Sequence, residues 1–272
     1  MTGKSSVHVE RLVWRGGMTR SAREVAVEAA VAFVYDGGAE AVMMATPADL
    51  HDFAVGFSLN EGVIASADDI VELGVVEVAR GTELRMTLRQ GDRERVMARR
   101  RLRAGPAGCG LCGIESIGAA LRPLPRVQAG VSVGVDEIIH AMRSMRGQQT
   151  LNARTHAVHA AGFYRPDAGL VAIREDVGRH NALDKLAGAL ARTGEKASGG
   201  AVLLTSRVSV ELVQKTAVMG ASVLAAVSAP TALALEEAEA AGITVVGIVR
   251  DDGLEVFTHP ERVLTQEGAR AR

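Results

Sequence analysis

Aromatic residues are scarce in this sequence and make up only 3% of its 272 residues. Proteins that bind single-stranded nucleic acid rely on aromatic side chains on which the bases stack, so the composition argues against such a surface. An excess of one charge is also missing, because the formal net charge at pH 7 is -1. The chain therefore has no overall field that attracts nucleic acid or a membrane surface, and we expect neither as a partner.

Long hydrophobic runs are missing as well. Residues 1–17 hold four charged side chains and no apolar core, so they lack the pattern of a signal peptide. The uncharged run 216–235 contains Gly220, Ser228 and Pro230, and it fits a helix end, a buried strand and a new helix better than a membrane span. The sequence predicts a cytoplasmic protein.

Cysteine is nearly absent, and its two copies, Cys109 and Cys112, are separated by only two residues. Four of the nine residues in 105–113 are glycine, which leaves the backbone pliable and the sulfur atoms uncovered. Two thiols at this spacing can form a disulfide, pass sulfur between them or supply half of a metal site. In the cytoplasm such a pair is more often catalytic or metal-binding than a structural bridge.

Zinc and redox sites are alternatives for this cysteine pair, besides a purely structural role. Structural zinc takes four ligands, but His156 and His159 fall on a predicted strand with opposite side-chain directions, so we expect no zinc. The zinc deaminase signature is not met, because His8 and Glu10 lie far from Cys109 and no proline directly precedes that cysteine. The position of the pair still permits a thioredoxin-like role, although no aromatic residue precedes it.

Arginines crowd the stretch just before the cysteine segment. Positive charge there would stabilise a thiolate and attract an anionic partner. The same pattern fits the solvated face of a strand equally well, and the sequence leaves both interpretations open. The residues are Arg93, Arg95, Arg99, Arg100, Arg101 and Arg103.

A proline-containing segment divides the chain. Pro123 and Pro125 forbid a helix or a central strand, so they mark a linker between a domain of residues 1–122 and a domain of residues 123–272. The second domain alternates strands with helices, which predicts an α/β unit with a mainly parallel sheet. Its predicted helices are 135–146, 180–191, 209–220 and 231–241, the third of them capped by Ser209. Its predicted strands are 156–163, 170–174, 201–205, 223–227, 243–249 and 254–257.

The first domain is predicted as mixed α+β. Thr46 is placed to cap a helix whose apolar residues follow at helical spacing from Leu50. Alternating residues over 74–88 predict a hairpin. The stretch 24–35 fits either one long strand or two.

Polar side chains follow three predicted strands of the second domain, where each strand leads into a helix. Helix N-termini bind anions, and α/β folds place ligands at the carboxyl ends of strands. Capping alone would explain any one loop, but three along one sheet edge indicate a ligand that bears phosphate. The residues are Glu175, Asp176, Arg179, His180 and Asn181, then Ser206, Arg207 and Ser209, then Ser228 and Thr231.

Five segments, in order along the chain, resemble blocks of the FdhD family, the formate dehydrogenase accessory sulfurtransferases. The segment Glu175–Ala182 is the most specific of them. One departure is Ser206, where many relatives carry glycine. The segments are Thr46–Leu50 with Ala54–Phe57 and Glu61–Gly62, Cys109–Gly113, Glu175–Ala182, Ser206–Ser209 with Glu211 and Lys215, and Ser228–Thr231.

The resemblance implies a function. Family members take sulfur from a cysteine desulfurase as a cysteine persulfide, and they hand it to a molybdenum or tungsten bis-guanine-dinucleotide cofactor that then enters formate dehydrogenase. They are cytoplasmic and form homodimers. The resemblance also implies an α/β fold, α+β overall, with a smaller mixed amino-terminal domain. The carboxyl-terminal domain would be a three-layer α/β unit that resembles cytidine deaminase without its zinc site.

Carried over to this chain, the resemblance makes it a sulfurtransferase with the persulfide on Cys109 and Cys112 as its partner. The cofactor would be bound as cargo at the end of the last parallel strand and at the polar loops. A chaperone that binds the cofactor without covalent sulfur transfer is the alternative. The residues at that strand end are Ile248, Val249, Arg250, Asp251, Asp252 and Gly253.

Overall fold

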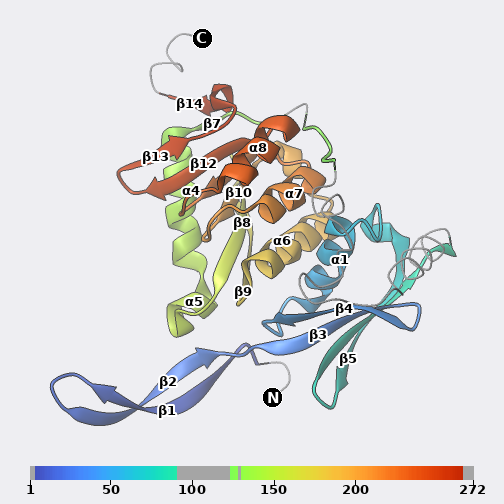
Figure 1. Ribbon diagram of the computed structural model, residues 1–272, viewed down its shortest axis with the longest axis vertical. Helices are drawn as coiled ribbons and strands as arrows, with labels where there is room; N and C mark the ends of the chain where they lie inside the picture. The colour runs from blue at the N-terminus through green and yellow to red at the C-terminus, as the bar shows by residue number, and fades with distance from the viewer. Residues whose placement is uncertain (1–3, 91–122, 128–129, 266–272) are drawn as a thin grey trace.

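The amino-terminal half consists of a long hairpin and a four-stranded sheet that carries one helix (Figure 1). The computed structural model describes residues 4–90, 123–127 and 130–265. The hairpin, called the arm below, pairs β1 (Ser6–Trp14) with β2 (Met18–Ala26). The sheet has the order β4-β3-β6-β5. Its elements are β3 (Ala29–Tyr35), β4 (Gly38–Ala45), α1 (Leu50–Asn60), η1 (Ala67–Asp69), β5 (Ile70–Val78) and β6 (Gly81–Leu88).

The hairpin predicted over 74–88 is confirmed as β5 and β6, and the stretch 24–35 holds the end of β2 and all of β3. The prediction that Thr46 caps the next helix is wrong, because α1 starts only after Asp49. The hydroxyl of Thr46 instead accepts a hydrogen bond of 3.1 Å from the backbone N–H of Val177. The Thr46 hydroxyl thus bonds to the other half of the chain instead of capping the helix that follows it.

Four of the eight aromatic residues pack together in the core of this first half. The rings of Phe33 and Phe57 stack with their centroids 3.9 Å apart, and Phe53 meets Phe33 edge-on at 5.0 Å. Tyr35 is fully buried beside them. These rings hold α1 against the sheet, so these four aromatic side chains serve packing.

The carboxyl-terminal half is built on a six-stranded sheet with the order β13-β12-β11-β10-β8-β9 (Figure 1). The three central strands β10, β11 and β12 are parallel, but β8 and β13 run against their neighbours. The elements are β7 (Val133–Gly134), α4 (Val135–Gln148), α5 (Thr150–Thr155), β8 (His159–Arg165), β9 (Gly169–Asp176), α6 (Arg179–Thr193), η2 (Ala197–Gly199), β10 (Ala201–Leu204), α7 (Val210–Met219), β11 (Val223–Ala226), α8 (Ala232–Ala241), β12 (Thr244–Arg250), β13 (Gly253–Val256), η3 (Pro260–Arg262) and β14 (Val263–Leu264).

The prediction of a mainly parallel sheet is therefore wrong, since only the pairs β10/β11 and β11/β12 are parallel among the described strands of this sheet. A short turn over 166–168 joins β8 to β9. A connection of this length can only return the chain antiparallel, because a parallel crossover needs a dozen residues or more.

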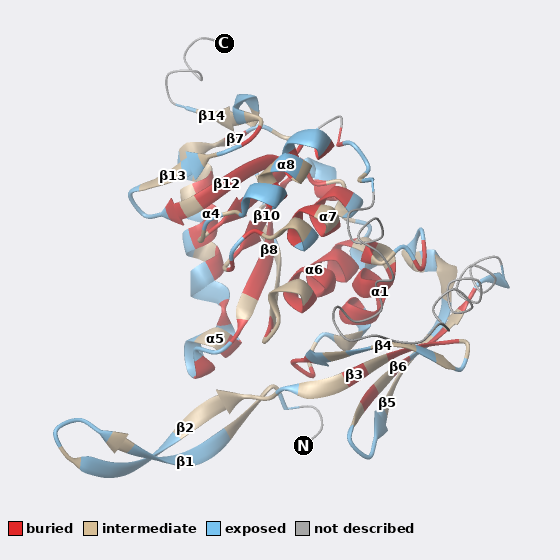
Figure 2. Ribbon diagram, in the orientation of Figure 1, coloured by how far each residue is buried: buried red, intermediate tan, exposed pale blue. Residues whose placement is uncertain are grey.

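This sheet is the middle one of three layers, as expected. Val202 and Leu204 face the core that α6, α7 and α8 form on one side, while Ala201 and Leu203 face α4 on the other. This alternation is the two-residue period of a strand that is covered on both faces. Figure 2 shows that burial is concentrated in this sheet and in α6, whereas most of the arm is exposed.

Two glycines allow the halves of the molecule to meet. A Cβ atom on Gly56 of α1 would lie 1.7 Å from the backbone oxygen of Asp184, and one on Gly188 of α6 would lie 1.8 Å from that of Asp52. The backbones of α1 and α6 are therefore in direct contact at these two positions. Such a close approach is possible only because neither glycine has a side chain. The predicted boundary at 122/123 stays a prediction, because residues 91–122 lie outside the described ranges.

No helix in the part of the chain that the structure describes is long and apolar enough to cross a membrane. The likeness of the carboxyl-terminal half to cytidine deaminase also stays a prediction.

Candidate functional site

The polar loops predicted from the sequence meet at one edge of the six-stranded sheet. Strands β9, β10, β11 and β12 all end there, and the antiparallel strand β8 begins there with His159. We call this the polar edge. It comprises His159 and the loops 176–180, 205–209, 227–231 and 250–253.

Asp176 is the innermost residue of the polar edge and is fully buried. Its Oδ2 atom accepts hydrogen bonds from the Thr46 backbone N–H at 3.0 Å and from Lys185 Nζ at 2.6 Å. Its Oδ1 atom accepts from the Gly178 backbone at 2.8 Å and from Asn181 Nδ2 at 2.9 Å. Burial lowers the pKa of Lys185, and the carboxylate of Asp176 opposes that shift. Asp176 and Asn181 thus support the loop from within.

Glu175 has a different structural task. Its two carboxylate oxygens each accept a 2.8 Å hydrogen bond, one from the Leu151 backbone N–H and one from that of Asn152. These are the first N–H groups of the short helix α5, which have no partner within the helix itself. Glu175 therefore fastens α5 to the end of β9.

Arg179 and His180 open α6 and lie at the surface of the polar edge. His180 Nε2 is 2.7 Å from the Glu211 carboxylate on α7, and this hydrogen bond lowers the pKa of Glu211. Burial lowers the pKa of His159, and the nearby charges of Arg179 and His180 lower it further. The Nε of Arg179 is buried and has no hydrogen-bond partner among the described residues. This group is a donor that is free to meet an acceptor.

The next two loops are tied to each other. Val208 and Pro230 form a parallel bridge, and the Thr231 N–H donates to the Val208 carbonyl at 3.0 Å. The Thr231 hydroxyl caps α8 by accepting from the Ala234 N–H at 3.4 Å, as its position in the sequence indicates. Ser228 joins the last loop, because its carbonyl accepts from the Ile248 N–H at 3.4 Å.

Ser206, Arg207 and Ser209 occupy the loop after β10. Ser206 is buried and its hydroxyl donates to the Arg207 carbonyl at 3.0 Å, while the Arg207 side chain is exposed. Ser209 lies at the N-cap of α7 without a side-chain cap bond, and its hydroxyl is 3.5 Å from His180 Nε2. The prediction that Ser209 caps this helix through its side chain is wrong. Its hydroxyl faces the imidazole instead.

The segment Ile248–Gly253 ends the polar edge at β12. The register shifts there, and Ile248 adopts a left-handed backbone with φ of 51°. Val249 is buried and Asp252 is exposed. The guanidinium of Arg250 donates to the carbonyl of Val227, which fastens this segment to the end of β11.

Asp251 reaches across to α4. Its carboxylate pairs with Arg146 at 2.7 Å and with Arg143 at 3.5 Å. The hydrogen bond from Arg146 lowers the pKa of Asp251. The segment that ends β12 is therefore fixed at both of its sides.

A cavity of about 370 Å³ opens within the polar edge. Part of its wall comes from Arg146, Gln149 and Asn152, for which the sequence indicated no role. These residues lie in α4, in α5 and between them rather than at the end of a strand. The Nε2 of Gln149 is buried there without a hydrogen-bond partner in the described part of the chain. The cavity is lined by Arg146, Gln149, Asn152, Val158, His159, Thr205 and Val227.

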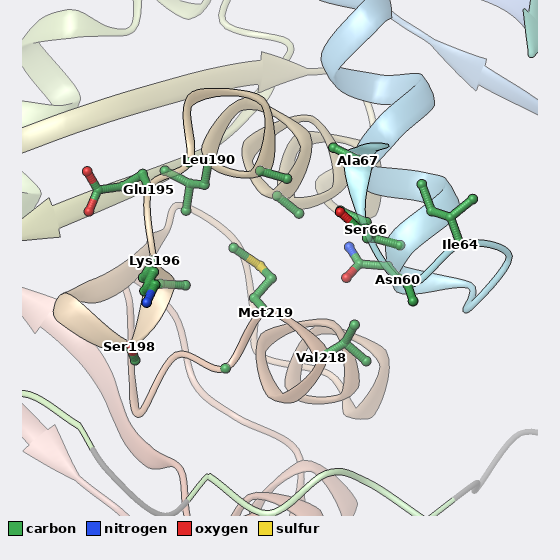
Figure 3. Close-up of a pocket in the computed structure, with 17 residues that line it drawn as sticks. Asn60, Ile64, Ser66, Ala67, Leu190, Glu195, Lys196, Ser198, Val218 and Met219 are labelled. Carbon is green, nitrogen blue, oxygen red and sulfur yellow. The ribbon is translucent and has the colours of Figure 1, made fainter. Parts of the chain in front are cut away.

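A larger cavity of about 720 Å³ lies away from the polar edge, where α1, α6 and α7 end (Figure 3). Figure 3 shows Met219 and Leu190 at its wall, with Lys196 and Ser66 at other sides. None of the residues predicted as site residues lines this cavity within the described ranges.

The two cysteines predicted to carry sulfur, Cys109 and Cys112, lie outside the described residues, as do the arginines of 93–103. The described residues contain no group of three or more histidine, cysteine or acidic side chains that could hold a metal ion.

Comparisons with known proteins match this chain to one family. A family model described as the FdhD/NarQ family matches residues 26–264. The chain is 54% identical over 243 residues to a sulfur carrier protein FdhD from Agrobacterium fabrum (strain C58 / ATCC 33970), which covers 89% of this chain and 90% of that protein. It is 51% identical over 263 residues to the protein of the same name from Brucella abortus biovar 1 (strain 9-941), with 96% and 98% covered.

A solved structure has the same fold. It is the crystal structure of a protein from Desulfotalea psychrophila described as a formate dehydrogenase accessory protein, and it superposes with a TM-score of 0.75 at 26% sequence identity. The match covers 96% of this chain and 100% of that chain.

Proposed function

This chain belongs to the FdhD/NarQ family, and from that premise we propose that it is a sulfur carrier for the maturation of formate dehydrogenase. In this proposal it accepts sulfur from a cysteine desulfurase in the cytoplasm as a persulfide on Cys109. It then transfers the sulfur to a molybdenum or tungsten bis-guanine-dinucleotide cofactor, which it holds as cargo. It acts as a homodimer.

The sulfur chemistry follows from the two thiols. The Cys109 thiolate attacks the outer sulfur of the donor persulfide; a new S–S bond forms on Cys109, and the donor cysteine leaves as a thiolate. Attack of the Cys112 thiolate on the inner sulfur then forms a Cys109–Cys112 disulfide and releases the outer sulfur as sulfide. The two cysteines supply the two electrons for this reduction, and a cellular thiol reductant restores them.

The observation that carries the cargo part of the proposal is the set of unpartnered donors at the polar edge. The Nε of Arg179 and the Nε2 of Gln149 are buried there without hydrogen-bond partners among the described residues. Leaving such donors unsatisfied costs about 1–3 kcal/mol each, so they favour a ligand with many acceptor oxygens. The phosphates of a dinucleotide are ligands of that kind.

The test is the intact mass of the protein after incubation with a cysteine desulfurase and cysteine. We expect the wild type to gain one sulfur, which a reductant removes, and Cys109→Ala to gain none. Cys112→Ala is expected to gain the sulfur and to release it more slowly. Sulfur loading of Cys109→Ala at the wild-type level would refute the assignment of the nucleophile.

The alternative is a chaperone that binds the cofactor without sulfur transfer. It predicts that a Cys109→Ala/Cys112→Ala double variant still activates formate dehydrogenase in cells. The sulfur-carrier proposal predicts that this variant has no activity above a strain that lacks the protein.

A further inference from the structure

The arm projects from the body of the molecule as an isolated two-stranded sheet (Figure 1). At about 3.3 Å per residue, its nine-residue strands extend about 30 Å. Within the described ranges, only the base of the arm is bonded to the rest of the molecule: Arg23 donates to the Thr155 carbonyl at 3.1 Å, and Glu24 pairs with Arg154 at 2.6 Å. A two-stranded hairpin without cover is marginally stable in water, so the outer part of the arm lacks the support that a third strand or a helix provides.

The outer part of the arm carries a contiguous apolar face. Trp14 stands opposite Met18, and Leu12 lies two residues before Trp14 on β1. Because side chains alternate along a strand, these three lie on the same face of the hairpin. They are 60–70% exposed, with Trp14 the most exposed. Exposed apolar side chains that gather on one face mark an interaction site more often than scattered ones do.

The charges beside this face indicate the kind of partner. Two exposed arginines flank it, one in the turn and one directly opposite Leu12, whereas Glu10 is the only acidic residue in 10–23 and lies on the same face at the end nearer the base. Pairing of two arms from two copies would bring these arginines together, and like charges in a shared sheet are destabilising. An apolar groove with an acidic rim fits the face instead. The two arginines are Arg15 and Arg20, and Arg11 lies on the opposite face beside Ser21.

The base of the arm is continuous with the polar edge. Arg23 and Glu24 bind α5, and the N-terminus of α5 is held by Glu175 at the end of β9. Asn152 of α5 also lines the 370 Å³ cavity. A protein that takes a ligand from this edge must come close to it, and the arm extends from the same place.

We propose that the arm docks this chain onto the protein that receives the cofactor, cofactor-free formate dehydrogenase, through an apolar groove with an acidic rim. This inference rests on the proposed function. It concerns a segment that almost entirely precedes the matched family model, which begins at residue 26, the last residue of β2.

The test is the affinity of purified cofactor-free formate dehydrogenase for the full chain, measured by biolayer interferometry. We expect Trp14→Ala/Met18→Ala to bind at least tenfold more weakly than the wild type. A Val42→Ala/Val71→Ala double variant is the matched control, because both residues are exposed and apolar but lie on β4 and β5. This control is expected to bind like the wild type.

A charge-reversal variant supplies a second, independent readout. Arg15→Glu/Arg20→Glu changes only exposed side chains, and circular dichroism of each variant confirms that the fold is kept. We expect wild-type binding to weaken as salt rises and this variant to bind weakly at every salt concentration. Equal affinity of both arm variants and the wild type would overturn the proposal, as would the absence of any wild-type binding.

Sulfur loading separates this proposal from the proposed function. Arm variants that load sulfur on Cys109 normally but fail to bind the dehydrogenase support the docking role. If the arm variants instead lose binding to the cysteine desulfurase, or if they change the oligomeric mass of the protein, the arm serves another partner. Either result refutes the docking proposal. Failure of the wild type to load sulfur refutes the proposed function alone.

Discussion

At the scale of single residues, two neighbours on α6 join the halves of the molecule through buried charges. Lys185 reaches Asp176 at 2.6 Å and also the Thr46 carbonyl at 2.8 Å. Asp184 accepts from Lys215 at 2.7 Å and from Asn60 Nδ2 at 2.7 Å. Burial raises the pKa of Asp184, and Lys215 opposes that shift. Each ion pair is buried, and a buried charge without its partner would destabilise the fold.

We expect Lys185→Met to lower the free energy of unfolding by about 3–5 kcal/mol, because it leaves the Asp176 carboxylate buried without its counter-charge. Urea unfolding followed by circular dichroism measures this loss. Arg85→Met is the matched control, since Arg85 pairs with Glu83 at 2.7 Å on the surface and its loss is expected to cost less than about 1 kcal/mol. Similar losses for both variants would contradict the role of burial.

His159 predicts a pH dependence. Burial lowers the pKa of His159 from its ordinary value of 6.5. Between pH 6.5 and the lowered pKa, the imidazole is protonated in the unfolded chain but still neutral in the folded chain. Stability is therefore lost as pH falls through that window and changes no further below it. We expect His159→Gln to remove this part of the slope. Thermal denaturation of both proteins between pH 8 and pH 5 is the check, and parallel curves would count against it.

At the scale of elements, long periodic segments were predictable and long-range partners were not. The core helices α6 and α8 lie within two residues of their predicted ends, because apolar spacing and terminal glycines are local signals. Helix α5 was not predicted. It has six residues, and its first N–H groups are satisfied by Glu175, which is more than twenty residues away in the sequence. Such a cap leaves no local pattern.

At the candidate site too, features that depend on local sequence were predictable and long-range contacts were not. The convergence of the polar loops followed from where strands end, which the sequence indicates. Which members face inward did not follow, and Asp176 and Asn181 are bonded within the protein. Arg146 and Gln149 were missed because they reach the polar edge from α4, whose position across the sheet is set by tertiary packing.

The contact between α1 and α6 predicts that Gly188→Ala is destabilising. The added methyl group would lie 1.8 Å from the Asp52 backbone oxygen, so the helices must separate, at a cost of about 1–3 kcal/mol. Gly147→Ala in α4 is the control. Nothing lies within 4 Å of its added carbon, and we expect stability to be unchanged or slightly raised. Calorimetric melting of both variants decides, and equal melting temperatures would disprove the close contact.

At the scale of the whole molecule, the two halves behave as one body at their junction. The carboxylate of Asp52 on α1 pairs with Arg174 at 2.6 Å and also with Arg192, which lie on β9 and α6. The bond from the Thr46 N–H to Asp176 joins the loop before α1 to the polar edge. The amino-terminal half is therefore bonded directly to the segment that leads into α6, where Arg179 and His180 lie.

The arm has a consequence for how this protein is observed. Trp14 is its only tryptophan, and that residue stands exposed near the tip of a hairpin, far from every buried cluster of the described chain. Intrinsic tryptophan emission therefore reports on the surroundings of the arm and is nearly blind to the melting of the core. An unfolding curve measured from that emission would describe the hairpin. A shift of its wavelength on mixing with a partner that contains no tryptophan would report docking of the arm directly.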